Sequence, residues 1–106
     1  MPVDGVGGVF DALADANRRE LVMRLAERET ATATELAAEL PITRQGIAKH
    51  LSALREAGLV APERLGRETR YRLTPAPLGG AMSWMASVGA RWDERLAALE
   101  RYFSGR

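Results

Sequence analysis

The sequence predicts a mainly helical domain with one small β-hairpin, in the order helix, helix, helix, helix, strand, strand, helix. Two observations support this fold class. Apolar residues recur every three or four positions over most of the 106-residue chain, and the period shortens to two after Gly58. We expect one domain over residues 9–103, with a mobile tail at residues 1–8 and a short tail at residues 104–106.

The first two helices are predicted on either side of Asp15. Residues 10–14 are short and apolar on one side, through Phe10 and Leu13. Asp15 is a good N-cap for a second helix over residues 16–28, because a carboxylate can accept hydrogen bonds from the first N–H groups of a helix. Apolar and charged residues alternate with helical period in that segment, so the helix is expected to be amphipathic.

A tight turn then joins two further helices. Thr34 is the expected N-cap of a short helix over residues 35–40, which Pro41 stops. Thr43 is the expected N-cap of a longer helix that runs to about residue 57, so only two residues separate the stop from the next start. This arrangement is typical of a helix-turn-helix.

A hairpin and a long helix follow. Gly58 suits a left-handed residue that ends the preceding helix, and residues 59–64 and 69–73 are predicted strands joined by a glycine-containing loop. Pro75 breaks the strand pattern before a last helix that runs to about residue 103. The apolar stripe of that helix consists of Leu78, Met82, Met85, Val88, Trp92, Leu96, Leu99 and Phe103.

The stripe of the last helix predicts a dimer. Each large apolar side chain contributes about 1.5–3 kcal/mol when it is fully buried, and a chain of this size has little other surface to cover the stripe. Core packing within one chain is the alternative. We expect both, with one side packed inward and the other in a symmetric interface. The expected interface residues are Phe10, Leu13, Trp84, Val88, Trp92, Leu96 and Leu99.

The helix that Thr43 begins carries groups that can read DNA. At 100° per residue, Ile47, Leu51 and Leu54 gather on the core side and polar residues gather opposite. Gln can bond an adenine edge, Arg or Lys can bond guanine or phosphate, and a small residue lets a helix lie deep in a major groove. The expected DNA contacts are Arg44, Gln45, Gly46 and Lys49, with His50 as a packing residue or a phosphate contact.

The hairpin adds more basic residues. A basic helix face alone is more often only a solvated surface, but here a tight turn precedes it and a basic hairpin follows. Arg64, Arg67 and Arg70 are expected to contact phosphates or a minor groove. The alternative is that these charges protect an edge strand from aggregation, and for Arg72 both interpretations are equally supported.

The net charge of +1 hides a local excess. Residues 41–73 hold seven basic and three acidic side chains, a net charge of +4, and the remaining residues carry −3. The predicted helix-turn-helix and hairpin therefore form a basic surface, which favours a nucleic-acid partner.

Composition argues against several other classes. The chain has no Cys and one His, so a disulfide framework, a thiolate or zinc site and a nucleophilic triad lack the residues they need. No phosphate-binding glycine loop is apparent, so we expect no enzyme, no metal and no cofactor. Without a long apolar run or a signal peptide, the chain is expected in the cytoplasm with no membrane partner.

Four segments occur in a specific combination: FDALADANRR at residues 10–19, ELA at 35–37, KHLSALREAGLV at 49–60 and GRETRYRL at 66–73. Together they resemble the ArsR-type winged helix-turn-helix regulators, over roughly residues 9–103. The resemblance implies a homodimeric bacterial transcription factor, usually a repressor, that dimerises through its first and last helices. It also implies DNA contacts from Arg44, Gln45, Gly46, Lys49 and wing residues such as Arg67.

One departure from the family pattern concerns the effector. Metal-sensing members carry a Cys-x-Cys pair just before the acid-Leu-Ala of the third helix, where this chain has Thr32 and Thr34. The last helix also lacks the histidines of zinc-sensing members. The chain therefore resembles the metal-independent branch, and an unidentified small-molecule effector is compatible with it.

The leading hypothesis is a dimeric, sequence-specific repressor, compatible with autoregulation. Its recognition helices would enter successive major grooves of an imperfect palindrome, with the wings on the flanking DNA. The alternative is a winged-helix protein-interaction module that does not read DNA. That alternative predicts that Arg44, Lys49 and Arg67 can become Ala without loss of function.

Overall fold

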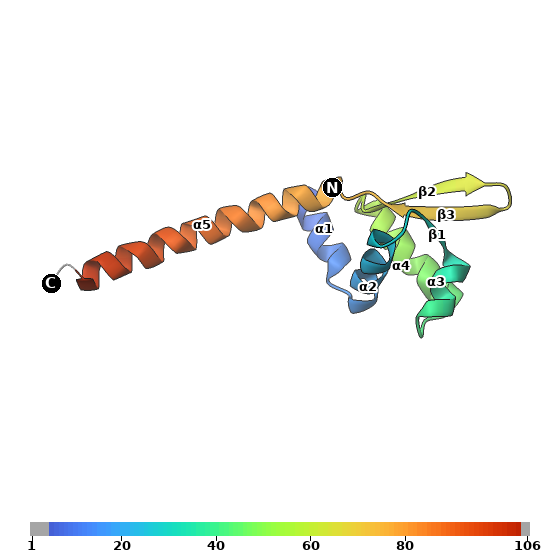
Figure 1. The fold of residues 1–106 in the computed structure, drawn as a ribbon, viewed down its shortest axis with the longest axis horizontal. Coiled ribbons are helices and arrows are strands. Elements are labelled where there is room, and N and C mark those ends of the chain that lie inside the picture. The colour runs from blue at the N-terminus through green and yellow to red at the C-terminus, as the bar shows by residue number, and fades with distance from the viewer. Residues whose placement is uncertain (1–4, 105–106) are drawn as a thin grey trace.

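The computed structural model describes residues 5–104, an elongated molecule of 71 × 31 × 24 Å. The helices and strands of this part follow the order α1 (Gly5–Leu13), α2 (Ala16–Ala26), β1 (Ala31–Thr32), α3 (Ala33–Glu39), α4 (Arg44–Glu56), β2 (Val60–Leu65), β3 (Glu68–Leu73) and α5 (Ala76–Ser104). Figure 1 shows a body built from α1 to α4, from which the β2–β3 hairpin projects on one side and α5 on the other. The predicted fold class is confirmed.

One apolar core joins the helices of the body. Ile47, Leu51 and Leu54 are completely buried, so α4 turns its predicted core side inward. Leu21 and Leu25 of α2 do the same. The other fully buried large side chains come from α1, α3 and the start of the hairpin: Val9, Leu36 and Leu59. This packing fixes which face of α4 remains for solvent or a partner.

Three predicted helix ends are confirmed. Asp15 caps α2 by accepting hydrogen bonds from the N–H groups of Asn17 at 2.8 Å and Arg18 at 3.2 Å. Thr43 caps α4, since its Oγ1 accepts from the Gly46 N–H at 3.0 Å. Gly58 has a φ of +77°, a left-handed conformation that glycine adopts without strain.

The predicted start of α3 was wrong. Thr32, not Thr34, is the N-cap: its side chain accepts from the Glu35 N–H at 3.0 Å, and Glu35 accepts from the Thr32 N–H at 2.8 Å. This reciprocal pair is a capping box. Thr32 also lies in β1, a strand that was not predicted because two residues are too few for a periodic pattern.

The sheet has three strands in the order β1-β3-β2, all antiparallel. The β2–β3 hairpin pairs over its full length, from Val60↔Leu73 to Leu65↔Glu68. By contrast, β1 pairs with β3 only at Ala31↔Tyr71 and Thr32↔Arg70. The outer half of the hairpin therefore extends beyond the strand that attaches it to the body, as Figure 1 shows.

The first helix begins earlier than predicted. α1 starts at Gly5, so residues 5–8, which were expected in the mobile tail, are helical; residues 1–4 and 105–106 lie outside the described part. Contact with α5 explains this. Val9 and Ala81 are buried, and the Phe10 and Trp84 rings meet edge to face with centroids 5.5 Å apart.

Two arginines of α2 cap the C-terminal end of α1. Nη1 of Arg18 donates to the carbonyl oxygens of Asp11 and Ala12 at 3.3 and 3.4 Å. Nη1 of Arg19 donates to those of Leu13 at 2.7 Å and residue 14 at 3.2 Å. A positive charge at a helix C-terminus also complements the helix dipole. The two arginines of the NRR segment therefore connect the start of α2 to the end of α1.

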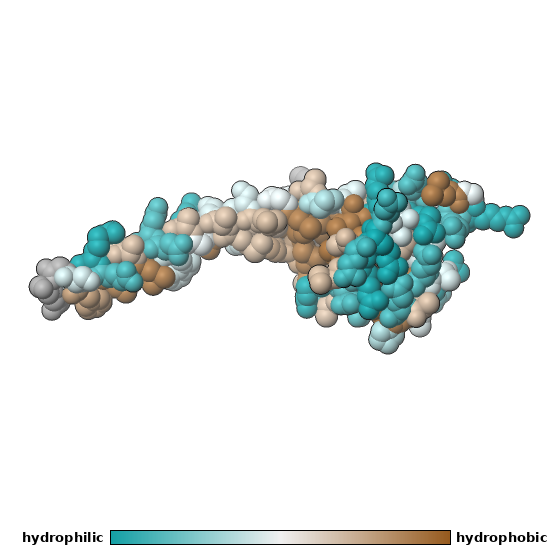
Figure 2. Space-filling model, in the orientation of Figure 1, coloured by the Kyte–Doolittle hydropathy of each residue, from teal (hydrophilic) through white to brown (hydrophobic). Residues whose placement is uncertain are grey.

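Most of α5 contacts no other element among the described residues. Leu78 packs against the core and Ala81 is buried, but the rest of the predicted stripe is exposed or half-buried. The expectation that one side of the whole stripe packs inward therefore holds only at its start. Figure 2 shows the apolar side chains continuing along the projecting helix. No helix in residues 5–104 has the length and apolar character needed to cross a membrane.

Candidate nucleic-acid interface

The exposed face of α4 begins at its first residue. Arg44, Gln45 and Lys49 are all exposed. Gln45 and Lys49 lie on the side away from the buried Ile47 and Leu51, and Arg44 is exposed because it is the first residue of the helix. Neither Arg44 nor Lys49 makes an ion pair or side-chain hydrogen bond with any residue in the described part. These two cations are therefore free to bind an external partner.

Gly46 has a role that was not predicted. It is half-buried, and a Cβ there would lie 2.8 Å from Cγ2 of Ile42 and 3.2 Å from Oγ1 of Thr43. Its N–H is already bound to the Thr43 side chain. Gly46 thus allows the close approach of the turn to α4, and its expected DNA contact stays a prediction.

A groove of about 570 Å³ lies between the N-terminal end of α4, α3 and the hairpin. It brings together three arginines from distant parts of the sequence, Arg44 of α4 and Arg64 and Arg67 of the hairpin. The remaining lining residues are Thr32, Ala33, Thr34, Glu35, Ala48, Glu68, Thr69 and Tyr71. The predicted helix contacts and wing contacts therefore share one surface.

The tip of the hairpin presents Arg67 to solvent. Gly66 has a φ of +62°, which lets the chain turn tightly between β2 and β3. Nε of Arg64 donates to the Gly66 carbonyl at 3.1 Å, so Arg64 is held beside the turn. Arg67 makes no hydrogen bond or ion pair within the described residues.

Arg70 differs from the other arginines of the hairpin. Its side chain is only 21% exposed and makes three hydrogen bonds inside the molecule. Nε donates to Oγ1 of Thr30 at 2.8 Å, Nη2 to Glu35 at 3.0 Å and Nη1 to Glu68 at 3.2 Å. This engagement does not support the expected DNA contact at Arg70.

The same contacts change the charge of the groove. The N–H of Thr32, against the opposing effect of burial, and then the charge of Arg70 lower the pKa of Glu35 from its ordinary value. Glu35 is therefore a carboxylate at neutral pH, and Arg70 forms an ion pair with it and with Glu68. The three lining arginines that pair with no carboxylate among the described residues, Arg44, Arg64 and Arg67, leave the groove basic.

His50 lies on the flank of α4 and is half-buried. The pKa of the Asp15 carboxyl is lowered chiefly by the hydrogen bond from the backbone N–H of Arg18, and the nearby His50 makes a smaller contribution. Both expected roles of His50, packing and a phosphate contact, stay predictions.

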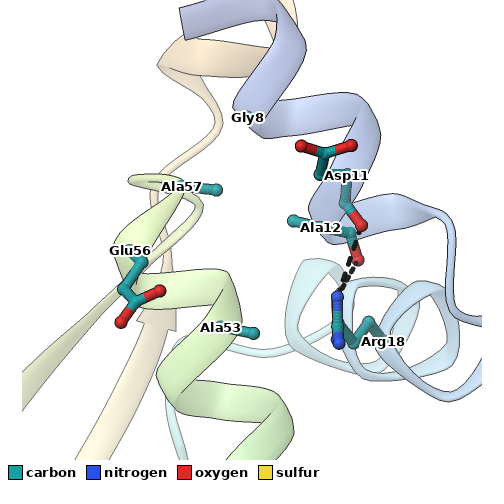
Figure 3. A pocket seen from close by; sticks show the side chains of 7 residues that line it. All are labelled: Gly8, Asp11, Ala12, Arg18, Ala53, Glu56 and Ala57. Carbon is teal, nitrogen blue, oxygen red and sulfur yellow. Dashed lines mark hydrogen bonds between the residues drawn. The ribbon is translucent and has the colours of Figure 1, made fainter. Parts of the chain in front are cut away.

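A second hollow, of about 240 Å³, lies between α1 and α4 (Figure 3). It meets the C-terminal half of α4 at Ala53, Glu56 and Ala57, whereas the basic groove meets the N-terminal half. Arg18 borders it, and the Nε atom of Arg18 is buried with no hydrogen-bond partner among the described residues. The two hollows are therefore separate.

The chain is similar to known helix-turn-helix proteins in sequence and in structure. A family model described as a helix-turn-helix domain matches residues 13–63. A solved ArsR-like transcriptional regulator from Rhodococcus sp. RHA1 is 40% identical, with a TM-score of 0.85 over 96% of this chain and 93% of that one. The chain belongs to the ArsR family. This confirms the predicted resemblance, and the family is one of transcriptional regulators rather than enzymes.

Two further relatives concern regulation and assembly. The transcriptional repressor SdpR of Bacillus subtilis is 28% identical over 91 residues, which are 86% of this chain and all of SdpR. Mb0332 of Mycobacterium bovis, a possible ArsR-family regulator solved as a homodimeric winged helix-turn-helix DNA-binding domain, is 27% identical. Its TM-score is 0.63 over 88% of this chain and 82% of that one.

Proposed function

We propose that this ArsR-family chain is a sequence-specific DNA-binding regulator that acts in the cytoplasm as a homodimeric repressor. The observation that carries the proposal is the shared groove of Arg44, Arg64 and Arg67, next to the exposed N-terminal face of α4. Arg44 and Arg67 have no partner among the described residues, so their guanidinium groups are available to phosphates or guanine edges.

The proposed binding mode follows from this surface. α4 enters the major groove, where Gln45 reads a base edge and Arg44 and Lys49 contact a base or the backbone. The hairpin lies along the flanking DNA, where Arg67 and Arg64 contact phosphates or the minor groove. The groove between the two elements then faces the sugar-phosphate backbone that separates these contacts.

A dimer supplies a second copy of the same surface. The exposed apolar side of α5, with Trp92, Leu96 and Leu99 each more than half exposed, is the proposed contact between copies. The homodimeric state of Mb0332 supports this assembly. Two recognition helices about 34 Å apart would match an imperfect palindrome, and occupancy of a promoter would block polymerase.

Selection of bound duplexes from a random library tests the proposal. The wild-type chain should enrich an imperfect palindrome at low salt, and the double variant Arg44→Ala/Lys49→Ala should enrich none. Arg55→Ala is the matched control, because Arg55 is an exposed basic residue at the far end of α4. If the double variant selects the same sequence as the wild type, the chain does not read DNA with this face.

A further inference from the structure

Arg70 connects three segments that lie far apart in the sequence. Each of its three side-chain nitrogen atoms donates a hydrogen bond to a different residue: Thr30 before β1, Glu35 in α3 and Glu68 on its own strand. The Oε1 atom of Glu35 that accepts from Arg70 also accepts from the Thr32 N–H. The hairpin is thus bonded to the capping box at the start of α3.

The hairpin has little other attachment at this point. Its strand β3 pairs with β1 at two residues only, Tyr71 and Arg70, and beyond Arg70 the ladder continues only between β2 and β3. Arg67 lies three residues farther out, on the tip. A small rotation of the hairpin about this attachment would therefore move Arg67 farther than it moves Arg70.

We propose that Arg70 is a positioning residue that fixes the angle between the hairpin and the helix-turn-helix. It thereby holds Arg67 at the distance from α4 that the DNA backbone requires. The inference rests on the proposed DNA contacts of the hairpin, and its effect would pass through Arg67 rather than through a contact of Arg70 itself.

The chemistry of the side chain fits this role. A guanidinium has five N–H groups in a rigid plane, so it can hold three acceptors in a fixed arrangement. Both carboxylates that it binds lie in the groove lining. Arg70 therefore fixes the positions of both carboxylates relative to the hairpin.

A mutant cycle on a selected duplex distinguishes positioning from direct contact. Arg67→Ala should weaken binding about tenfold and lower the slope of log K against log salt by about 0.9 for each phosphate that the variant no longer neutralises. Arg70→Ala should give a similar loss. If Arg70 acts through Arg67, the double variant should bind within about twofold of Arg70→Ala.

Two further variants keep the test independent of folding defects. Thr30→Val removes one acceptor of Arg70 at nearly constant size, outside the groove lining, and should lower affinity in the same direction by a smaller factor. Arg72→Ala removes a neighbouring exposed charge that has no partner among the described residues, and its effect should multiply with that of Arg67→Ala. Multiplicative effects of Arg70→Ala and Arg67→Ala would overturn the proposal.

The free protein provides a test that does not depend on DNA binding. The chain has no Cys, so spin labels can be attached at Ala38→Cys on α3 and Leu65→Cys on β2, both exposed positions. Labelled chains are diluted with unlabelled ones, so that only distances within one chain are measured. Arg70→Ala should broaden or shift the distance distribution, and Arg72→Ala should leave it unchanged.

These two experiments separate the two proposals. An unchanged distance distribution in Arg70→Ala would overturn the positioning role, whatever the DNA affinity. If the distribution broadens but Arg67→Ala leaves DNA affinity unchanged, Arg70 positions the hairpin and the proposed DNA contact of the hairpin is wrong.

Discussion

At the scale of single residues, the role of each basic side chain near α4 depends on whether the chain already binds it. Arg44 and Arg67 have no internal partner among the described residues, whereas Arg70 binds Glu35 and Thr30. The sequence could not separate them, because those partners lie 35 and 40 positions away. Local spacing therefore predicted a basic surface correctly without predicting its division into free and engaged residues.

Gln45 and Arg67 should affect DNA binding in different ways. Gln45→Ala removes a group proposed to read a base edge, so discrimination should fall by about 1–3 kcal/mol at one position of each half-site. Arg67→Ala should weaken all duplexes about equally. Dissociation constants for single-base variants of a selected duplex measure both effects. Equal losses on all duplexes with Gln45→Ala would show that Gln45 does not read a base.

Gly46→Ala should destabilise the protein despite the better helix propensity of Ala. The added Cβ would meet Cγ2 of Ile42 at 2.8 Å, and relief of such overpacking costs about 1–3 kcal/mol. Gly79→Ala is the control, because nothing lies within 4 Å of a Cβ at that site in α5. Urea denaturation measures both, and equal or greater stability of Gly46→Ala would contradict the proposed close contact.

At the scale of elements, the helix-turn-helix was predictable because its signals are local. Asp15, Thr43 and Gly58 each act within a few residues of their own position. The predicted start of α3 was wrong because two threonines that can cap a helix lie two residues apart. The Thr32–Glu35 spacing, which is that of a capping box, was the signal that could have identified Thr32 as the N-cap. β1 exists only because β3 lies beside it.

An ion-pair cluster joins α2 to α3 outside the basic groove. Arg28 binds both oxygens of Glu39, with Nη1–Oε2 at 2.8 Å and Nη2–Oε1 at 2.6 Å, and Arg24 adds a bond at 2.9 Å. These bonds, chiefly those from Arg28, lower the pKa of Glu39 from 4.5 to about 2. The cluster holds α3, and with it the start of the turn, against α2.

Acid should weaken this connection. Because the pKa of Glu39 is lower in the folded state, the unfolded chain takes up the proton first, and stability falls as the pH drops from 4.5 toward 2. Glu39→Gln should therefore lose less of its melting temperature between pH 5 and pH 3 than the wild type. Glu94→Gln, on α5, should behave as the wild type does. An identical acid dependence of Glu39→Gln would show that the bonds from Arg28 and Arg24 do not make Glu39 a source of acid sensitivity.

At the scale of the whole molecule, apolar and basic surfaces occupy opposite ends. The hairpin and α4 carry the free arginines, and α5 carries exposed Trp92, Leu96 and Leu99 away from the body (Figures 1 and 2). The apolar stripe was predictable from its spacing. The small part of the stripe that the same chain covers was not predictable, because it depends on how far α1 extends along α5.

Leu96→Asp should convert a dimer into monomers. It places a charge within the proposed interface, which large apolar side chains stabilise by about 1.5–3 kcal/mol each when buried. Ala90→Asp is the matched control, because residue 90 is exposed and lies about 120° from residue 96 around α5 at 100° per residue, outside the apolar stripe. Sedimentation measures the mass of each variant. A dimer that persists in Leu96→Asp would place the interface elsewhere.

A hydroxyl-radical footprint of the wild-type chain on a selected duplex tests whether two copies of the α4 face bind DNA together. The proposed dimer predicts two protected segments centred about 34 Å apart, each with flanking protection from a hairpin that disappears in Arg67→Ala. A single protected segment, or a footprint that Arg44→Ala/Lys49→Ala leaves unchanged, would contradict DNA reading by paired copies of this face.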